Sequence, residues 1–98
     1  MWQLSLGPAD EPSLLAFLQA GELPRMLSYP KGSANMKVVP AVGDRVVITC
    51  KGRERALGII QHGFYETSRG LVANVVVTDI VYEQTPRRGQ RRNWTQIK

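Results

Sequence analysis

The sequence has very little of the chemistry that disulfides and metal centres require, since its 98 residues include one cysteine, Cys50, and one histidine, His62. A single cysteine excludes an internal disulfide and a zinc site built from cysteines. A single histidine leaves a catalytic triad or a multi-histidine metal site little to draw on. Cys50 lies in the apolar run VVITC, which predicts a small buried core residue. We therefore expect no metal and no cofactor.

Signs of catalysis and of membrane insertion are also missing. The eight carboxylates are scattered singly, so no pair inside an apolar run suggests an acid and a base. Neither GPADEPS nor KGSANMK has the spacing, or the lysine followed by serine or threonine, of a phosphate-binding loop. The sequence therefore gives no positive sign of an enzyme. Without a long apolar run or a signal-peptide pattern, it predicts a soluble intracellular protein, in the cytoplasm or nucleus, with no membrane partner.

The net charge of +5 is concentrated at one end of the chain. Residues 86–98 carry five basic groups and no acid, whereas residues 1–85 carry eight basic and eight acidic groups. The five basic groups are Arg87, Arg88, Arg91, Arg92 and Lys98. A local cationic patch of this kind commonly binds polyanions, above all nucleic acid. The alternative is a solubilising tail.

Apolar patterns predict several strands and one helix. WQLSL alternates as a half-buried strand does. RVVITC, which follows a Val-Gly-Asp turn, ALGIIQHG, LVANVVVTDIVYE and NWTQI predict further strands. A short helix is expected between Asp10, as its cap, and Gly21, near its end. RMLSY is interpreted as a single helical turn.

Because the predicted strands do not alternate with helices, a parallel doubly wound sheet is not expected. The predicted fold class is mainly β with one or two short helices (α+β). We expect a small pseudobarrel of about five to six strands with a helix packed across one opening. The chain is predicted to form a single domain, residues 1–98, with a basic C-terminal segment, residues 86–98.

Three short motifs, in this order, resemble the PUA-like superfamily, and within it the EVE and ASCH type domains. They are an early tryptophan-containing strand with Trp2, a Gly43-Asp44 step that opens a strand, and a Gly58-Ile59 signature after a small residue. The resemblance spans nearly the whole chain. It describes a minimal version of the domain, because EVE domains are usually longer. It implies a pseudobarrel that binds nucleic acid, with a pocket for a flipped or modified base.

The chain departs from the ASCH enzymes in one respect. These enzymes use a lysine and glutamate set near the start of the domain. Glu22 and Arg25 lie where part of that set would be, but the lysines are absent. The resemblance therefore does not support hydrolase activity.

Several residues are candidates for a base pocket, because an unpaired base stacks on an aromatic face and hydrogen-bonds through its edge. QHGFYETSRG predicts a loop at the mouth of the barrel, and Phe64 within it is as well explained by burial in the core. Tyr29 is a second candidate. Trp2 more often packs in a core than binds a ligand, although the resemblance favours it as a pocket wall. The full candidate set is Trp2, Tyr29, His62, Phe64, Tyr65 and Arg69.

The C-terminal stretch PRRGQRRNWTQIK places an arginine cluster directly before a hydrophobic strand. In a small barrel the first strand needs a partner, and NWTQI can supply one. Trp94 is then expected to anchor the end of the chain. This would hold Arg87, Arg88, Arg91 and Arg92 in place as a basic rim that binds nucleic acid, and not as a free arm.

Three functions follow from these patterns. The first is a nucleic-acid binding module, for RNA or DNA, that reads an unpaired or modified base in a shallow pocket. The second is a small protein-interaction module whose basic segment binds an acidic partner. The third is a nucleoside hydrolase of the ASCH type. The sequence leaves the identity of the base and the oligomeric state open.

Overall fold

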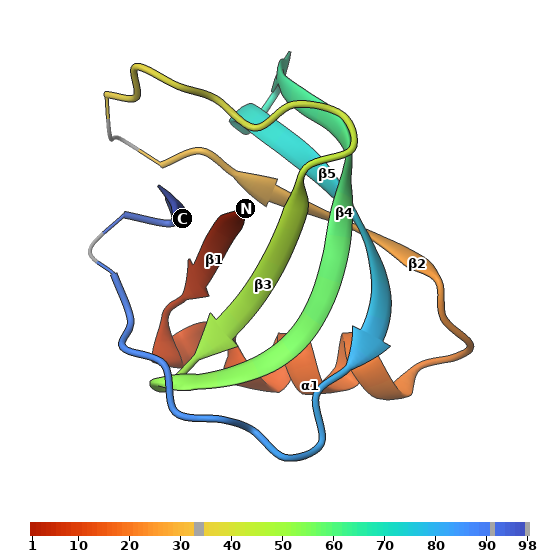
Figure 1. Ribbon diagram of the computed structural model, residues 1–98. Helices are drawn as coiled ribbons and strands as arrows, with labels where there is room; N and C mark the ends of the chain where they lie inside the picture. Colours follow the sequence, from red (N-terminus) through yellow and green to blue (C-terminus); the bar gives the residue numbers. More distant parts are fainter. Residues whose placement is uncertain (33–34, 91, 98) are drawn as a thin grey trace.

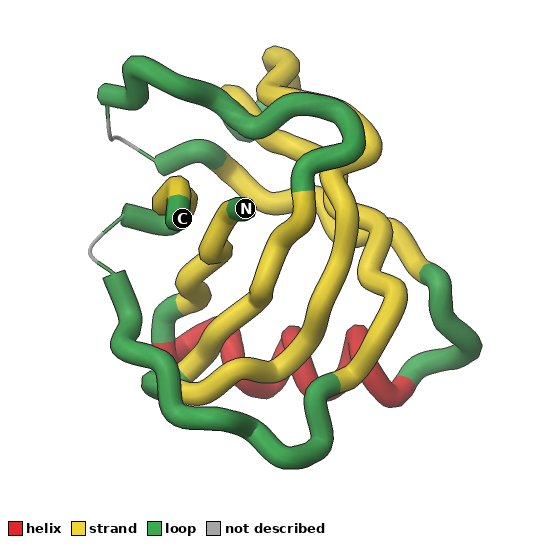
Figure 2. Tube along the Cα trace, viewed as in Figure 1, coloured by secondary structure: helices red, strands yellow, loops and turns green. Residues whose placement is uncertain are grey.

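The computed structural model describes residues 1–32, 35–90 and 92–97 (Figure 1). Within these residues, six strands, one α-helix and one short 3₁₀ helix follow each other along the chain. They are β1 (Trp2–Leu6), η1 (Pro8–Asp10), α1 (Glu11–Gln19), β2 (Arg25–Pro30), β3 (Arg45–Cys50), β4 (Arg53–Thr67), β5 (Gly70–Ile80) and β6 (Trp94–Gln96). Figure 2 shows how strands dominate the fold, with the helix lying along one end of the curved sheet.

The six strands form one mixed sheet in the order β2-β5-β4-β3-β1-β6. All neighbours are antiparallel except β1 and β3, which run parallel with Trp2 opposite Val46 and Leu6 opposite Cys50. The sheet curves until its two edges approach each other, and the indole N–H of Trp94 in β6 donates to the carbonyl of Pro30 in β2 at 3.0 Å. The structure is thus a mainly β pseudobarrel with one α-helix, which confirms the predicted fold class.

The core lies inside the curve of the sheet. Inward-facing residues from five strands are almost fully buried, among them Leu4, Ile48, Ile60 and Val75. Leu14 and Leu18 of α1 close this core from one end. Cys50 is buried as predicted, and burial raises the pKa of its thiol.

The helix begins without the cap that the sequence predicted. Asp10 precedes α1, but its side chain makes no capping hydrogen bond. Its carboxylate instead accepts a hydrogen bond from the Tyr29 hydroxyl at 2.7 Å. This contact ties the start of the helix to β2. The tertiary partner therefore replaces the local one.

The prediction of a half-buried first strand is wrong, because all five residues of β1 are buried. Trp2, Leu4 and Leu6 face the core, as the alternation indicated. Gln3 and Ser5 face the other side, where Arg88, Gln90 and Asn93 cover them. A polar face can be buried in this way because the covering segment supplies hydrogen-bond partners.

Two further predictions about local structure are wrong. RMLSY is not a helical turn, since it lies in β2, which pairs with β5 along its whole length. The predicted loop QHGFYETSRG is mostly strand, since β4 continues to Thr67 and only Ser68 and Arg69 form the turn. Shifts in register between β4 and β5, at positions 57–58 and 60–65, let this long strand bend. The bend replaces the loop that the mixed polar and aromatic sequence suggested.

Candidate functional site

The basic segment, residues 86–98, is fixed to the body of the protein in its described part. Pro86 bridges to Arg53, and the Arg87 N–H donates to the Gly52 carbonyl at 2.8 Å. The segment then crosses the outer face of β1 until the Asn93 carbonyl accepts a hydrogen bond from the Ser5 N–H, at 2.8 Å. Trp94, which follows, is 1% exposed. The prediction that Trp94 anchors the end of the chain is confirmed.

A buried amide holds the middle of this segment. Gln3 is 1% exposed, and its Nε2 donates to the Arg88 carbonyl at 2.9 Å. The same nitrogen lies within hydrogen-bond distance of the hydroxyls of Ser5 and Thr49, at 3.1 and 3.3 Å. These two hydroxyls are 3.4 Å apart. This polar cluster fixes the course of the arginine-rich chain over the sheet.

Replacing Gln3 by alanine should therefore release the basic segment without removing any of its charge. The change leaves buried acceptors unpaired, and each such group costs about 1–3 kcal/mol. We expect faster amide hydrogen exchange at Arg87 and Gln90 and a lower unfolding midpoint. Gln61→Ala, on the exposed part of β4, is the matched control. Unchanged exchange in the Gln3 variant would mean that the cluster does not hold the segment.

The described arginines of the predicted rim do not have equivalent surroundings. Arg87 is paired with Glu54, with Nε 2.6 Å from Oε2. Arg88 and Arg92 are exposed. Arg91 lies outside the described residues. The cluster thus divides into one arginine engaged by a carboxylate and two that face solvent.

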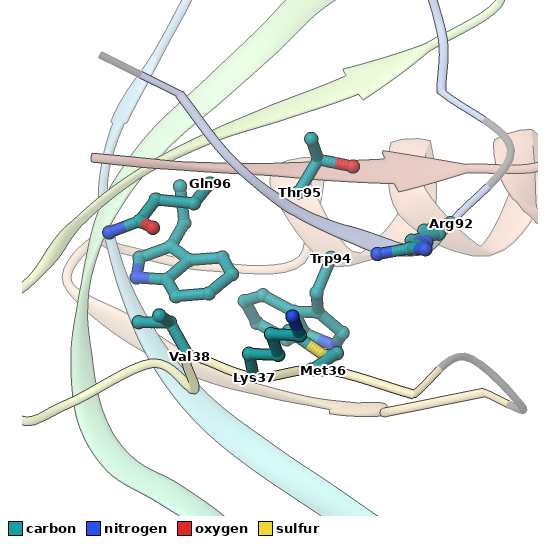
Figure 3. A pocket seen from close by; sticks show the side chains of 8 residues that line it. Met36, Lys37, Val38, Arg92, Trp94, Thr95 and Gln96 are labelled. Carbon is teal, nitrogen blue, oxygen red and sulfur yellow. The ribbon is translucent and has the colours of Figure 1, made fainter.

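Arg92 borders a hollow of about 260 Å³, which we call the indole hollow (Figure 3). One wall comes from the loop before β3. The other comes from β1, from β6 and from Arg92, which lies just before β6. Its lining residues are Trp2, Met36, Lys37, Val38, Arg92, Trp94, Thr95 and Gln96. In Figure 3 the side chain of Thr95 lies on the opposite side of β6 from that of Trp94.

Both indoles of this hollow are held by hydrogen bonds to the protein. The Nε1 of Trp2 donates to Asp44 Oδ2 at 3.0 Å, and that of Trp94 donates to the Pro30 carbonyl. The Ala41 N–H and the Trp2 indole lower the pKa of Asp44, so its carboxylate stays charged. The indole N–H groups are thus already occupied. Polar contacts with a ligand would come from Lys37, Arg92 and Gln96.

The loop that forms the other wall is fixed against β4. Pro40 is buried, and its carbonyl oxygen lies 2.8 Å from where a Cβ on Gly63 would be. Only glycine permits this approach. The Gly43 N–H then donates to the Ile60 carbonyl at 2.9 Å. These contacts place Met36, Lys37 and Val38 opposite β6.

The structure does not gather the six predicted base-pocket residues around one site. Trp2 alone lines the indole hollow. The Tyr29 hydroxyl donates a hydrogen bond to Asp10. The pKa of this hydroxyl is raised, mainly by burial and then by the hydrogen bond. Arg69 lies in the exposed turn between β4 and β5.

The other three residues lie in β4 and not in a loop. Phe64 packs against the core, with its ring edge-on to Trp94 at a centroid distance of 5.8 Å. This supports the alternative that placed Phe64 in the core. His62 and Tyr65 contact each other edge to face at 4.8 Å. The Tyr65 hydroxyl also donates to Asn74 at 3.0 Å. His62 and Tyr65 therefore contact other residues of the sheet and do not line the hollow.

Sequence reasoning missed most of the lining of the indole hollow. Met36, Lys37 and Val38 lie in a stretch with no apolar period, so no local signal marked them. Gln96 could have been found, because strand alternation places it on the same side of β6 as Trp94.

Comparisons with protein-family models, with curated proteins and with solved structures found no match. No helix in the described part of the chain is long and apolar enough to cross a membrane. Within residues 1–32, 35–90 and 92–97, no three histidine, cysteine or acidic side chains gather as metal ligands would.

Proposed function

We propose that this protein binds nucleic acid across the basic segment and the indole hollow. One observation carries the proposal: the described part of the segment that holds the net charge is fixed in place and leads Arg92 to a hollow that Lys37 also lines. In this proposal Arg88, Arg92 and Lys37 contact phosphates, while an unpaired base enters the hollow. The resemblance to the PUA-like superfamily, which is itself a proposal, supports nucleic-acid binding. We place this function in the cytoplasm or nucleus.

The size and lining of the hollow favour a small flat ligand. Its volume of about 260 Å³ lies below the usual range for drug-sized ligands. Trp2 and Trp94 supply aromatic surface, although they are only 2% and 1% exposed. A base would therefore meet ring edges first, and full stacking on an indole face requires the loop at Met36–Val38 to shift. Base–aromatic contact and cationic side chains together are typical of single-strand recognition.

The same lining favours binding over hydrolysis. No carboxylate is among the residues that line the hollow in the described part of the chain. The nearest acid in the hydrogen-bond network, Asp44, is occupied by Trp2 and by the Ala41 N–H. Acid–base catalysis would need a group within reach of the reacting atoms.

Removing the two cations of the hollow should weaken binding to single-stranded oligonucleotides. We expect Lys37→Ala and Arg92→Ala each to flatten the slope of log affinity against log salt by about 0.7–0.9, as the loss of one phosphate contact does. Fluorescence anisotropy over a salt series measures this slope. Arg69→Ala removes the same charge from an exposed turn and is the matched control.

The controls separate this proposal from its rivals. If Arg69→Ala weakens binding as much as Arg92→Ala, the contact is diffuse and the hollow has no part in it. If a generic polyanion competes as well as a defined oligonucleotide of equal charge, base contact is absent. A protein that binds neither ligand would favour an acidic protein partner for the basic segment.

A further inference from the structure

A second surface, on the outer face of β3, β4 and β5, has a composition unlike that of the basic segment. Leu57 and Ile59 point outward from β4 and are 37% and 43% exposed, while their neighbour Ile60 is 1% exposed. They border a shallow hollow of about 300 Å³ with Arg45, Gly58, Thr78 and Asp79 among its lining residues. We call the set Arg45, Leu57, Gly58, Ile59 and Asp79 the β4 patch.

The register of the sheet places the two charges of the patch on opposite sides. Arg45 in β3 lies opposite Ile59, and Asp79 in β5 lies opposite Leu57. Paired residues of antiparallel strands project to the same face, so all four side chains share one surface. Arg45 and Asp79 form no salt bridge within the described residues. The Thr78 hydroxyl donates to Asp79 Oδ2 at 2.9 Å.

Gly58, between Leu57 and Ile59 in β4, is buried, because strand alternation turns it toward the core side of the sheet. A Cβ there would lie 2.6 Å from the Val76 carbonyl oxygen and 2.7 Å from Cγ1 of Val75. Glycine is therefore required by the packing of β4 against β5, and Leu57 and Ile59 on either side of it carry the apolar surface of the outer face. On the outer face, Arg45 beside Ile59 and Asp79 beside Leu57 lie at diagonally opposite corners of the patch.

We propose that the β4 patch binds a second copy of this chain in a two-fold symmetric dimer. In such a dimer the same surface meets itself, so where one residue contacts a second residue of the other copy, the reverse contact also forms. Arg45 of one copy then faces Asp79 of the other at both ends of the contact. Leu57 and Ile59 fill the space between them. One charge of each sign on opposite sides of an apolar centre makes the surface complementary to itself.

The patch itself is small, so the dimer belongs among weak, reversible contacts and not among obligate ones. An acid beside apolar groups does not suit nucleic acid, which sets this surface apart from the proposed binding site.

Charge reversal tests the pairing directly. Sedimentation velocity of the full chain, from low to high micromolar concentration, should show a monomer–dimer equilibrium. We expect Arg45→Asp and Asp79→Arg each to raise the dimer dissociation constant by about tenfold or more, because like charges then face each other. The double variant, with both charges exchanged, should recover the dimer.

Controls keep the test independent of folding. Circular dichroism must show an unchanged fold, and Arg69→Asp, in the β4–β5 turn, should leave the equilibrium as it is. Leu57→Ser should weaken the dimer through the apolar centre. A parent protein that stays monomeric throughout the concentration range would overturn the proposal. So would a double variant that stays monomeric while the parent dimerises.

Discussion

Replacing Trp94 by alanine is expected to lower the free energy of unfolding by about 3–5 kcal/mol, the usual cost of removing a large aromatic residue from a core. The side chain is 1% exposed, packs edge-on to Phe64 and donates to the Pro30 carbonyl. It therefore connects the two edges of the sheet. Because β6 has only three residues, few other contacts remain to hold it against β1.

Thermal or denaturant unfolding measures this loss. For a chain of this length, the expected change lowers the unfolding midpoint by at least about 12 °C. Tyr82→Ala is the matched control, since Tyr82 is 84% exposed and its loss should change stability by less than about 0.5 kcal/mol. If Trp94→Ala and Tyr82→Ala unfold alike, the C-terminal strand does not contribute to the fold. The arginines before it would then belong to a free arm.

A Trp94 variant that still folds also reports on the basic segment. With its anchor lost, the described residues of the basic segment before Trp94 depend on the Gln3 cluster, on the contacts of Pro86 and Arg87 and on the Asn93–Ser5 hydrogen bond. The arginines would keep their charge but lose part of their fixed geometry. A loss of oligonucleotide affinity with an unchanged salt slope would then mean that placement, and not charge number, decides binding.

The strands that sequence predicted correctly are those whose own residues carry the signal. RVVITC and LVANVVVTDIVYE are rich in β-branched residues and follow glycine turns. β3 matches the first, and β5 covers the second except for its last three residues. Trp94 was predicted to be buried because a strand pattern surrounds it. In each case local pattern and tertiary environment agree.

The errors have a common physical cause, which is contact with distant residues. β2 looks irregular because prolines flank it, yet its pairing with β5 makes it an edge strand. The outer face of β1 is buried by residues 85 positions further along the chain. The loop wall of the indole hollow is placed by the contact of Pro40 with Gly63, and no sequence pattern near residue 36 predicts that contact. The periodicity of a short stretch of sequence carries no information about burial by residues far away in the chain.

Gly58→Ala is the second substitution expected to have a large effect, although it adds a single methyl group. The new Cβ would lie 2.6 Å from a backbone oxygen, that of Val76, and 2.7 Å from Cγ1 of Val75. Backbone of a central strand cannot move aside as a flexible side chain can, so β4 and β5 must separate locally. Overpacking of this kind costs about 1–3 kcal/mol and occasionally more. We expect the upper part of that range, because the clash falls where the register between β4 and β5 already shifts.

Any glycine-to-alanine change also alters the free energy of the unfolded chain, so the steric effect at Gly58 must be separated from that general effect. Gly89→Ala is the matched control, since nothing lies within 4 Å of its added Cβ. That variant should be neutral or slightly more stable, because alanine restricts the unfolded chain more than glycine does. Both are compared by denaturant unfolding at low protein concentration, where the proposed dimer is dissociated. Equal midpoints for the two variants would show that β4 and β5 have more space at this bulge than the structure gives them.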